Sequence, residues 1–392
     1  MNSFSVSPTG TPPPQSRSQH TQARRPSLTE PAWETGNNGV IVTHDYIHLQ
    51  GLEIRNWSDN AIWTEGAGFL EVGDCLVHDV GCGVGLSDGT HDFLIQSVEA
   101  HHFDLYGFDA STGGGAPCHN GSFEDCVAHT ARDPEQNVDG FALGHGSQHD
   151  FALTRCETYD VYDGFDVSAA STTLDRCSAH GCWNGGYKLW QDDLLLTNCL
   201  GYGNSVTAVE LDWDGDPGTS TLWNCTFLGT GTFGVWVENA SDTLHLHNCI
   251  VAGGDGIALA FEQHSVSNYW GDHNVFHNDN PNRLIVVGYE DEFAETSVTG
   301  GQWTAYSGQD ANSLEATPGD LFLDAIAPDL QLRAGSPAID AGATEGAPGH
   351  DYAGSIRPQG QGVDIGAYER NPSQKSPVMS YKRALLRTGL LP

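Results

Sequence analysis

The sequence predicts an all-β protein whose main domain is a parallel β-helix, a solenoid of about ten coils. Three observations indicate this fold. A short phrase centred on cysteine recurs along the chain, the segments between its copies alternate apolar residues with Gly, Asn and Asp, and no helical period of useful length is present. The 48 glycines among 392 residues agree, because they favour tight turns between short strands.

The chain divides into four segments. Residues 1–36 are rich in Pro and Ser and are expected to be disordered. Residues 37–290 hold the repeat and form the predicted β-helix with its active-site face. Residues 291–370, where the repeat weakens and SPAIDAG and VDIGAYE appear, are expected to close the helix as a separate segment. Residues 371–392 form a basic, helix-prone tail to which we assign no function.

The recurring phrase places cysteine at the same slot in seven copies: GDCLVHD, EDCVAHT, TRCETYD, DRCSAHG, TNCLGYG, WNCTFLG and HNCIVAG. Its cysteines are Cys75, Cys126, Cys156, Cys177, Cys199, Cys225 and Cys249, and Val98 fills one further slot. Successive slots lie 23, 28, 30, 21, 22, 26 and 24 residues apart. Equivalent residues of stacked coils are about 4.8 Å apart, more than the roughly 3.8 Å between the Cβ atoms of a disulfide, so we expect buried free thiols here. The redox state of Cys82, Cys118 and Cys182 is open.

A second column follows three residues after each slot and contains His78, His101, His129, Tyr159, His180 and Tyr202. Two tyrosines interrupt the histidines, and no local tetrahedral ligand spacing appears. We therefore interpret this column as a stack of side chains at the turns rather than as a metal site.

The charge of the chain excludes some partners. Lys and Arg number 16 against 51 Asp and Glu, a formal charge of −35. A phosphate backbone needs a basic protein face, so we expect no nucleic-acid partner. No apolar run approaches the roughly 20 residues that span a bilayer, so we expect no membrane insertion. We expect a monomer that is secreted or held at the cell surface, although MNSFSVSPTG shows neither the basic start nor the apolar stretch of a signal peptide.

A third column carries charge on an outer face of the middle coils. It follows a Gly–aromatic or aliphatic step in YGFDA, DGFAL, DGFDV, GGYKL, TAVEL and FGVWV, and its members are Asp109, Ala142, Asp166, Lys188, Glu210 and Trp236, with Trp63 and Gly85 before them and Ala258 after. Three positions earlier stand Asp139 and Asp163. Lys188 is the only lysine before Lys375. Several carboxylates on one rigid face repel one another unless a cation joins them, and Ca²⁺ accepts such oxygen ligands without strict geometry.

At these residues the sequence resembles the family 9 polysaccharide lyases, right-handed parallel β-helix enzymes that cleave pectate by β-elimination. Their motifs correspond to NVDGFAL around Asp139, YDGFDV around Asp163 and Asp166, and GGYKLW around Lys188. The resemblance implies a calcium ion on Asp139, Asp163 and Asp166, with Lys188 as the Brønsted base. SPAIDAG and VDIGAYE resemble the C-terminal segments of many bacterial surface β-helix proteins.

The chain departs from the family pattern at two places. Tyr162 stands where the family has the first Asp of a pair, and we expect Asp160 to supply the missing ligand. Trp190 and Gln191 replace a Gly-Gly pair and are expected to reshape the sugar site. The residues that we expect to bind substrate are Glu210, Asp109, Tyr187, Trp190 and Tyr162.

The sequence therefore predicts a calcium-dependent lyase that acts on a uronic-acid polysaccharide such as pectate. A lysine base works only when neutral, so its pKa must fall from about 10.4, and we expect an alkaline optimum. Two alternatives stay open. NVDGF and the GHG at 144–146 are similar to polygalacturonase motifs, which suits a glycoside hydrolase. A non-catalytic surface β-helix could instead bind calcium or carbohydrate, with sugar platforms at Trp63, Trp190, Trp213 and Trp236.

Overall fold

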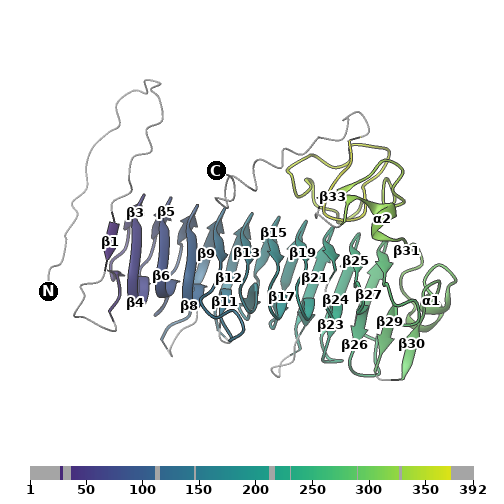
Figure 1. Cartoon of the computed structure of the whole chain (residues 1–392), viewed down its shortest axis with the longest axis horizontal. Helices are drawn as coiled ribbons and strands as arrows, with labels where there is room; N and C mark the ends of the chain where they lie inside the picture. Colours follow the sequence, from purple (N-terminus) through teal and green to yellow (C-terminus); the bar gives the residue numbers. More distant parts are fainter. Residues whose placement is uncertain are drawn as a thin grey trace.

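The computed structural model describes residues 27–29, 37–110, 115–144, 147–211, 217–229, 231–288, 290–325 and 329–371. These residues form an all-β protein, a right-handed parallel β-helix of about ten turns (Figure 1). Its helices are α1 (Gln302–Ser307) and α2 (Pro318–Leu321), both in the segment that follows the last coils. The predicted fold class is confirmed.

Each coil contributes strands to three faces. The site face contains β2 (Val40–Val42), β11 (Asp139–Leu143), β14 (Phe165–Val167), β17 (Gly185–Leu189), β20 (Thr207–Leu211), β23 (Phe233–Val237), β26 (Ile257–Phe261) and β29 (Ile285–Val287), with β30 (Asp291–Phe293) antiparallel at its end. The second face is a ten-stranded sheet of β3 (His48–Gln50), β5 (Glu71–Gly73), β7 (Leu94–Gln96), β9 (His119–Glu124), β12 (His149–Thr154), β15 (Thr173–Asp175), β18 (Leu194–Thr197), β21 (Thr219–Trp223), β24 (Thr243–His247) and β27 (Tyr269–Asp272).

The third face contains β1 (Ser27–Thr29), β10 (Val127–His129), β13 (Glu157–Tyr159), β16 (Ser178–His180), β19 (Leu200–Tyr202), β22 (Thr226–Leu228), β25 (Ile250–Ala252), β28 (Val275–His277) and β31 (Leu314–Glu315). In the first coils one long strand crosses the corner and serves both the third face and the site face: β4 (Glu53–Thr64), β6 (Leu76–Gly85) and β8 (Glu99–Asp109). Two strands of the closing segment, β32 (Phe322–Asp324) and β33 (Asp329–Leu332), pair with each other.

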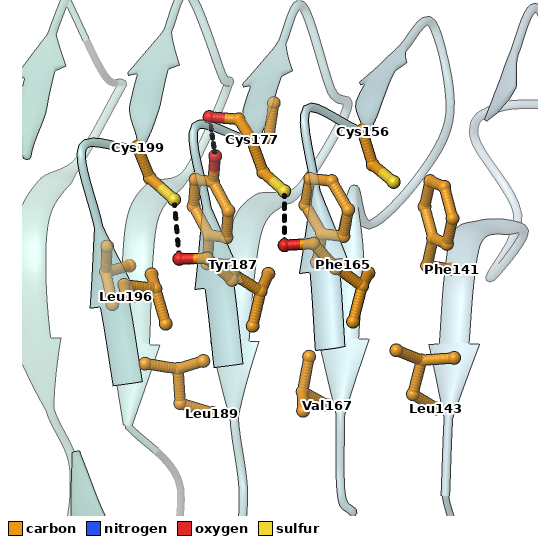
Figure 2. Packing of buried hydrophobic residues seen from close by; sticks show 14 of the residues in the cluster. Phe141, Leu143, Cys156, Phe165, Val167, Cys177, Tyr187, Leu189, Leu196 and Cys199 are labelled. Carbon is orange, nitrogen blue, oxygen red and sulfur yellow. Dashed lines mark hydrogen bonds between the residues drawn. The ribbon is translucent and has the colours of Figure 1, made fainter. Parts of the chain in front are cut away.

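The interior repeats from coil to coil. Phe108, Phe141, Phe165 and Tyr187 stack face to face beneath the site face, with ring centroids 4.6, 4.9 and 5.1 Å apart. Figure 2 shows the last three of these rings. The seven cysteines of the predicted column are buried beside them, and none of them forms a disulfide. Their thiols donate to main-chain carbonyls, as Cys177 does to Leu153 O at 3.6 Å. Cys82, Cys118 and Cys182, whose redox state the sequence left open, are also buried free thiols.

The His and Tyr column stacks along the outside of the third face, as predicted. Ring centroids of successive members from His78 to Tyr202 lie 4.6 to 5.2 Å apart, with ring planes within 22° of parallel. In the part of the chain that the structure describes, no three His, Cys, Asp or Glu side chains form a group that could hold a metal ion. The ring geometry agrees with the predicted stack of side chains.

The glycine of the Gly–aromatic step sits where two coils approach too closely for a side chain. A Cβ on Gly140 would lie 2.1 Å from the Thr158 hydroxyl, and one on Gly164 would lie 2.6 Å from Gly186 O. Contacts below 3.0 Å force a neighbour to move, and in these packed corners the neighbours are buried. The Gly–aromatic part of the repeated motifs thus serves packing.

The closing segment covers the outside of the third face in its last coils (Figure 1). Leu321, Leu332 and Ile365 pack there against Leu200 and Ile250. The asparagines that precede the last three cysteines bind this segment. Their contacts include Asn224 Nδ2 to Asp364 O at 2.9 Å, Asn248 Nδ2 to Ala343 O at 2.8 Å, and Asn198 Oδ1 accepting from Arg357 Nη2 at 2.9 Å.

The two ends of the chain lie largely outside the described residues. Within the predicted disordered segment 1–36, residues Ser27–Thr29 form β1, which pairs in parallel with Glu53–Arg55 of β4, so the prediction was wrong for these three residues. Pairing with β4 stabilises these three residues as a strand, which the Pro- and Ser-rich composition of the segment did not indicate. The tail 372–392 lies outside the described residues. No helix among the described residues is long and apolar enough to cross a membrane.

Candidate active site

Two columns of side chains line the outside of the site face. Each column consists of residues that pair with one another across adjacent parallel strands, and each coil contributes one residue, called a rung, to each column. The Lys188 column is Trp63, Gly85, Asp109, Ala142, Asp166, Lys188, Glu210, Trp236, Ala260 and Val286. The Asp139 column is Asn60, Cys82, Tyr106, Asp139, Asp163, Gly185, Thr207, Phe233 and Ile257. Both predicted columns form, with one correction. Ala260 rather than Ala258 pairs with Trp236, because Ala258 points into the core.

Lys188 is directed to Asp163 rather than to its register neighbour Asp166. Its ammonium nitrogen lies 3.0 Å from Asp163 Oδ2, with side-chain exposures of 13 % and 0 %. Apart from this ammonium, Asp163 Oδ2 has no hydrogen-bond partner among the described residues. Asp163 Oδ1 accepts from Asn184 Nδ2 at 2.9 Å and from the Gly185 amide at 2.8 Å. The Lys188 ammonium also lies 5.0 Å from the ring centre of Trp190, a cation–π contact.

Asp139 is the least satisfied carboxyl group of the face. It is 2 % exposed, and its Oδ1 has no hydrogen-bond partner among the described residues. Burial, and then repulsion from the Asp166 and Asp163 carboxylates, raise the pKa of Asp139 well above its ordinary value. A buried carboxyl group with one oxygen that lacks a donor, facing two other carboxylates, is a position where a positive charge would be strongly stabilised.

Two opposing effects act on the charge of Lys188. Burial alone disfavours the ammonium, but Asp163 and Asp166, with a smaller contribution from Glu210, outweigh it and raise the pKa of Lys188 above its ordinary value. As the side chains stand, the ammonium is therefore the counter-charge of the carboxylates. A further positive charge at this face would lower the pKa of Lys188 toward the range in which the amine is neutral.

The chemistry of these oxygens suits a hard cation such as Ca²⁺. Asp139, Asp163 and Asp166 belong to adjacent rungs, and two of the three present a buried oxygen that lacks a neutral hydrogen-bond donor. In the arrangement that the structure describes, however, they do not form a group of three ligands, and Lys188 holds the position next to Asp163. The donor set fits the ion, and binding would require Lys188 to move away from Asp163 Oδ2.

Two predicted site residues lie elsewhere. Tyr187 was predicted to bind substrate, but strand alternation turns it inward, where it is fully buried. Its hydroxyl donates to Leu200 O at 2.8 Å and to Cys177 O at 3.0 Å, and Figure 2 shows the second of these bonds. Asp160 was predicted to replace the missing calcium ligand. It lies exposed in the turn directly after the His and Tyr column with φ of 57°, and it is not brought together with the other carboxylates. Its equivalents in the following coils are Gly181 and Gly203, so Asp160 fills a left-handed turn position.

The remaining predicted residues lie on or beside the site face. Asp109 and Glu210 are buried rungs of the Lys188 column, 8 % and 7 % exposed. Trp190 is half-buried directly after β17, and Tyr162 is half-buried directly before Asp163. Trp213 belongs to residues 212–216, outside the described residues.

Three residues join the site that the sequence did not single out. Tyr106 is the rung before Asp139, and burial together with the charges of Asp139 and Asp109 raises the pKa of Tyr106. Thr207 is a fully buried rung whose hydroxyl has no hydrogen-bond partner among the described residues. Asn184 donates to Asp163. The Tyr in YGFDA stands where DGFAL has Asp139, so aligning the motifs by column would have found Tyr106, whereas no repeat marks Asn184.

Comparison with known proteins supports the fold. The model of a family described as right handed beta helix region matches residues 135–294. No curated protein matches the sequence. Among solved structures, pectate lyase Pel9A is similar at 15 % identity and a TM-score of 0.50, covering 88 % of this chain and 87 % of that one.

Two further similar structures are an endo-xylogalacturonan hydrolase from Aspergillus tubingensis and a periplasmic alginate epimerase, AlgG. The hydrolase has 12 % identity, a TM-score of 0.36 and coverage of 68 % of this chain and 86 % of that one. The epimerase has 11 % identity, a TM-score of 0.34 and coverage of 66 % and 68 %. At these identities the similarity to Pel9A establishes a shared β-helix architecture.

Proposed function

We propose that this chain is a polysaccharide lyase that cleaves a uronic-acid polysaccharide by β-elimination, with Lys188 as the base. One observation carries the proposal: the single lysine of the described residues is seated among the carboxylates of the site face, 3.0 Å from a fully buried one. A surface lysine for solubility would not be placed there. The β-helix fold shared with pectate lyase Pel9A supports a polysaccharide substrate.

The reaction removes the C5 proton of a uronic acid. The Lys188 amine takes that proton, the C5–H electrons form the C4=C5 double bond, and the C4–O bond breaks as the departing sugar oxygen takes a proton from water. Lys188 can act only after losing its own proton, and the surrounding carboxylates oppose that loss because they raise its pKa. We therefore expect activity to rise toward alkaline pH.

Calcium is part of this proposal. Asp139, Asp163 and Asp166 would hold the ion, and Ca²⁺ when bound would neutralise the C6 carboxylate of the sugar and so make the C5 proton more acidic. Asp109 and Glu210 border this position along the Lys188 column. Half-buried Trp190, on the same side as the Lys188 ammonium, offers an aromatic surface to the sugar.

A second candidate is a non-catalytic carbohydrate-binding or calcium-binding protein. The observation that favours it is the ion pair itself, since Lys188 paired with Asp163 and lying over Trp190 can be explained as a structural counter-charge. The two candidates differ in what they require of the amine. A base must exchange protons with the substrate, whereas a counter-charge only has to stay positive.

Absorbance in the ultraviolet during incubation with a panel of polyuronates tests the proposal, because elimination creates an absorbing unsaturated sugar. We expect a calcium-dependent rise that a chelator stops and that is lost in Lys188→Met while folding is retained. Lys188→Arg is the matched control. It keeps the positive charge beside Asp163 but cannot serve as a base near neutral pH, so it should also lose activity if Lys188 is the base. New reducing ends without absorbance would indicate a hydrolase, and neither signal on any substrate would favour the binding protein.

A further inference from the structure

Resting on the proposed lyase function, we infer that the preferred substrate carries isolated uronates separated by uncharged sugars rather than an unbroken run of uronates. The inference comes from the residues that flank Lys188 along the site face. A polymer that follows the β-helix axis meets a new rung of both columns at each coil, about every 4.8 Å.

The first observation is the charge of the two columns. They contain one basic side chain, Lys188, and these five acidic ones: Asp109, Asp139, Asp163, Asp166 and Glu210. The sequence segments 111–114, 145–146 and 212–216, which lie outside the described residues, contain no Lys or Arg. Arg132, Arg155 and Arg176 pair with carboxylates away from these columns.

This distribution suits one substrate carboxylate and opposes its neighbours. A uronate at the reaction centre would meet Lys188 and any cation held by the Asp cluster. A second uronate one coil beyond Lys188 on the C-terminal side would lie beside Glu210, and one three coils away on the N-terminal side would lie beside Asp109, with no basic side chain of the columns to receive it. Like charges about 10 Å apart near a protein surface repel by an amount equivalent to roughly tenfold in affinity.

The second observation is that aromatic residues flank the acidic residues of the two columns at both ends. On the C-terminal side, Phe233 and Trp236 occupy the next rung of both columns, with ring centroids 4.7 Å apart, and pack on Ile257, Ala260 and Val286. This apolar patch lies two coils beyond Lys188.

On the N-terminal side, Trp63 covers Gly85, where an added Cβ would lie 2.6 Å from the indole ring. Apolar sugar faces stack on aromatic rings, whereas charged groups keep their water there. Both ends of the site therefore suit neutral sugars.

The test compares initial rates on fully charged polygalacturonate, on the same polymer after partial random methyl esterification, and on a rhamnogalacturonan backbone in which uronate alternates with a neutral sugar. We expect kcat/KM to be at least about tenfold higher on the two polymers with spaced charges. Trp236→Ala should lower the ratio of kcat/KM on the spaced-charge polymers to kcat/KM on polygalacturonate by about tenfold. Trp63→Ala tests the same effect at the other end of the site. Trp270→Ala is the matched control, because Trp270 is 50 % exposed on the second face.

The outcomes separate the inference from the proposed function. A rate that is highest on the fully charged polymer would overturn the inference and leave the lyase function standing. If no polymer yields unsaturated product, the lyase function fails, and retardation of the native protein in gels containing the same polymers still measures the preference. Equal or stronger retardation by the fully charged polymer would then overturn the inference.

Discussion

At the residue scale, Lys188 and a bound cation would compete for one carboxylate. The Lys188 ammonium lies 3.0 Å from Asp163 Oδ2, the oxygen that a calcium ion on the cluster would use. Replacing Lys188 with Met removes the competing charge and leaves Asp139, Asp163 and Asp166 in place. We therefore expect Lys188→Met to bind Ca²⁺ at least about tenfold more tightly than the native protein in a calorimetric titration.

The control for this titration removes a cation elsewhere. Arg155 pairs with Asp125 at 2.7 Å at an exposed turn. Arg155→Met lowers the net charge equally but leaves the Asp cluster unchanged, so its Ca²⁺ affinity should stay near the native value. Equal affinities for the native protein and Lys188→Met would mean that the cluster does not hold the ion.

The members of the Lys188 column could be predicted from the sequence, but the hydrogen-bond and ion-pair partners of their side chains could not. Stacking fixes which residues share a column, so Asp109, Asp166, Lys188 and Glu210 follow from the motifs. The side-chain torsions that turn Lys188 toward Asp163 instead of Asp166 are not encoded in the repeat. Tyr187 was assigned to the site because it adjoins Lys188, although the period of two in a strand places it inside.

At the element scale, the start of several site-face strands depends on a glycine, which β20 and β26 replace with alanine. A Cβ on Gly164 would lie 2.6 Å from Gly186 O, 2.9 Å from Thr158 Cγ2 and 3.0 Å from Ala179 Cβ. We expect Gly164→Ala to lower the free energy of unfolding by roughly 1–3 kcal/mol, as overpacking of a core does.

Denaturant unfolding measures this effect, with Gly349→Ala as the control. An added Cβ at Gly349 has nothing within 4 Å, so that variant should unfold near the native midpoint. If Gly164→Ala is as stable as Gly349→Ala, the close approach of coils does not explain the repeated glycine.

The histidine stack of the third face should make the free energy of unfolding fall at acidic pH. Burial, and then the neighbouring His129, His78 and His102, lower the pKa of His101 to about 4, while Glu99 acts in the opposite direction. An unfolded histidine has a pKa of about 6.5, so below that pH the unfolded chain takes up a proton that the folded chain refuses. The contribution of the neutral His101 is complete above pH 6.5 and is lost as the pH falls toward 4.

Thermal unfolding between these pH values checks the stack. We expect His101→Asn to show a shallower fall in Tm on acidification than the native protein. His264→Asn, at a side chain that is 53 % exposed, should keep the native slope. Identical slopes for all three proteins would exclude His101 as the source of the acid sensitivity.

At the scale of the whole molecule, each coil contacts mainly its neighbours, so a β-helix is stabilised by the sum of adjacent interfaces. The sequence revealed this architecture because the repeat is local, with slots 21 to 30 residues apart. It could not reveal how the closing segment docks, because those contacts join residues about 140 positions apart, such as Asn224 and Asp364. The asparagine before each late cysteine was visible in TNC, WNC and HNC, but its partner was not.

Arg357 holds the closing segment to the coils. It is buried with Glu369 at 3.1 Å, with side-chain exposures of 1 % and 0 %, and it also donates to Asn198 of the β-helix. Arg357→Met would leave Glu369 buried without its counter-charge, a change that typically costs about 3–5 kcal/mol. We expect the closing segment to loosen while the middle coils persist, because solenoid stability is additive between neighbours. Hydrogen exchange should then show faster exchange in 336–369 and in β16, β19, β22 and β25, since Tyr352 of the closing segment also bonds Ser178 of β16, with β6, β8 and β10 unchanged. Uniformly faster exchange along the whole β-helix would show instead that the closing segment and the coils unfold as one cooperative unit.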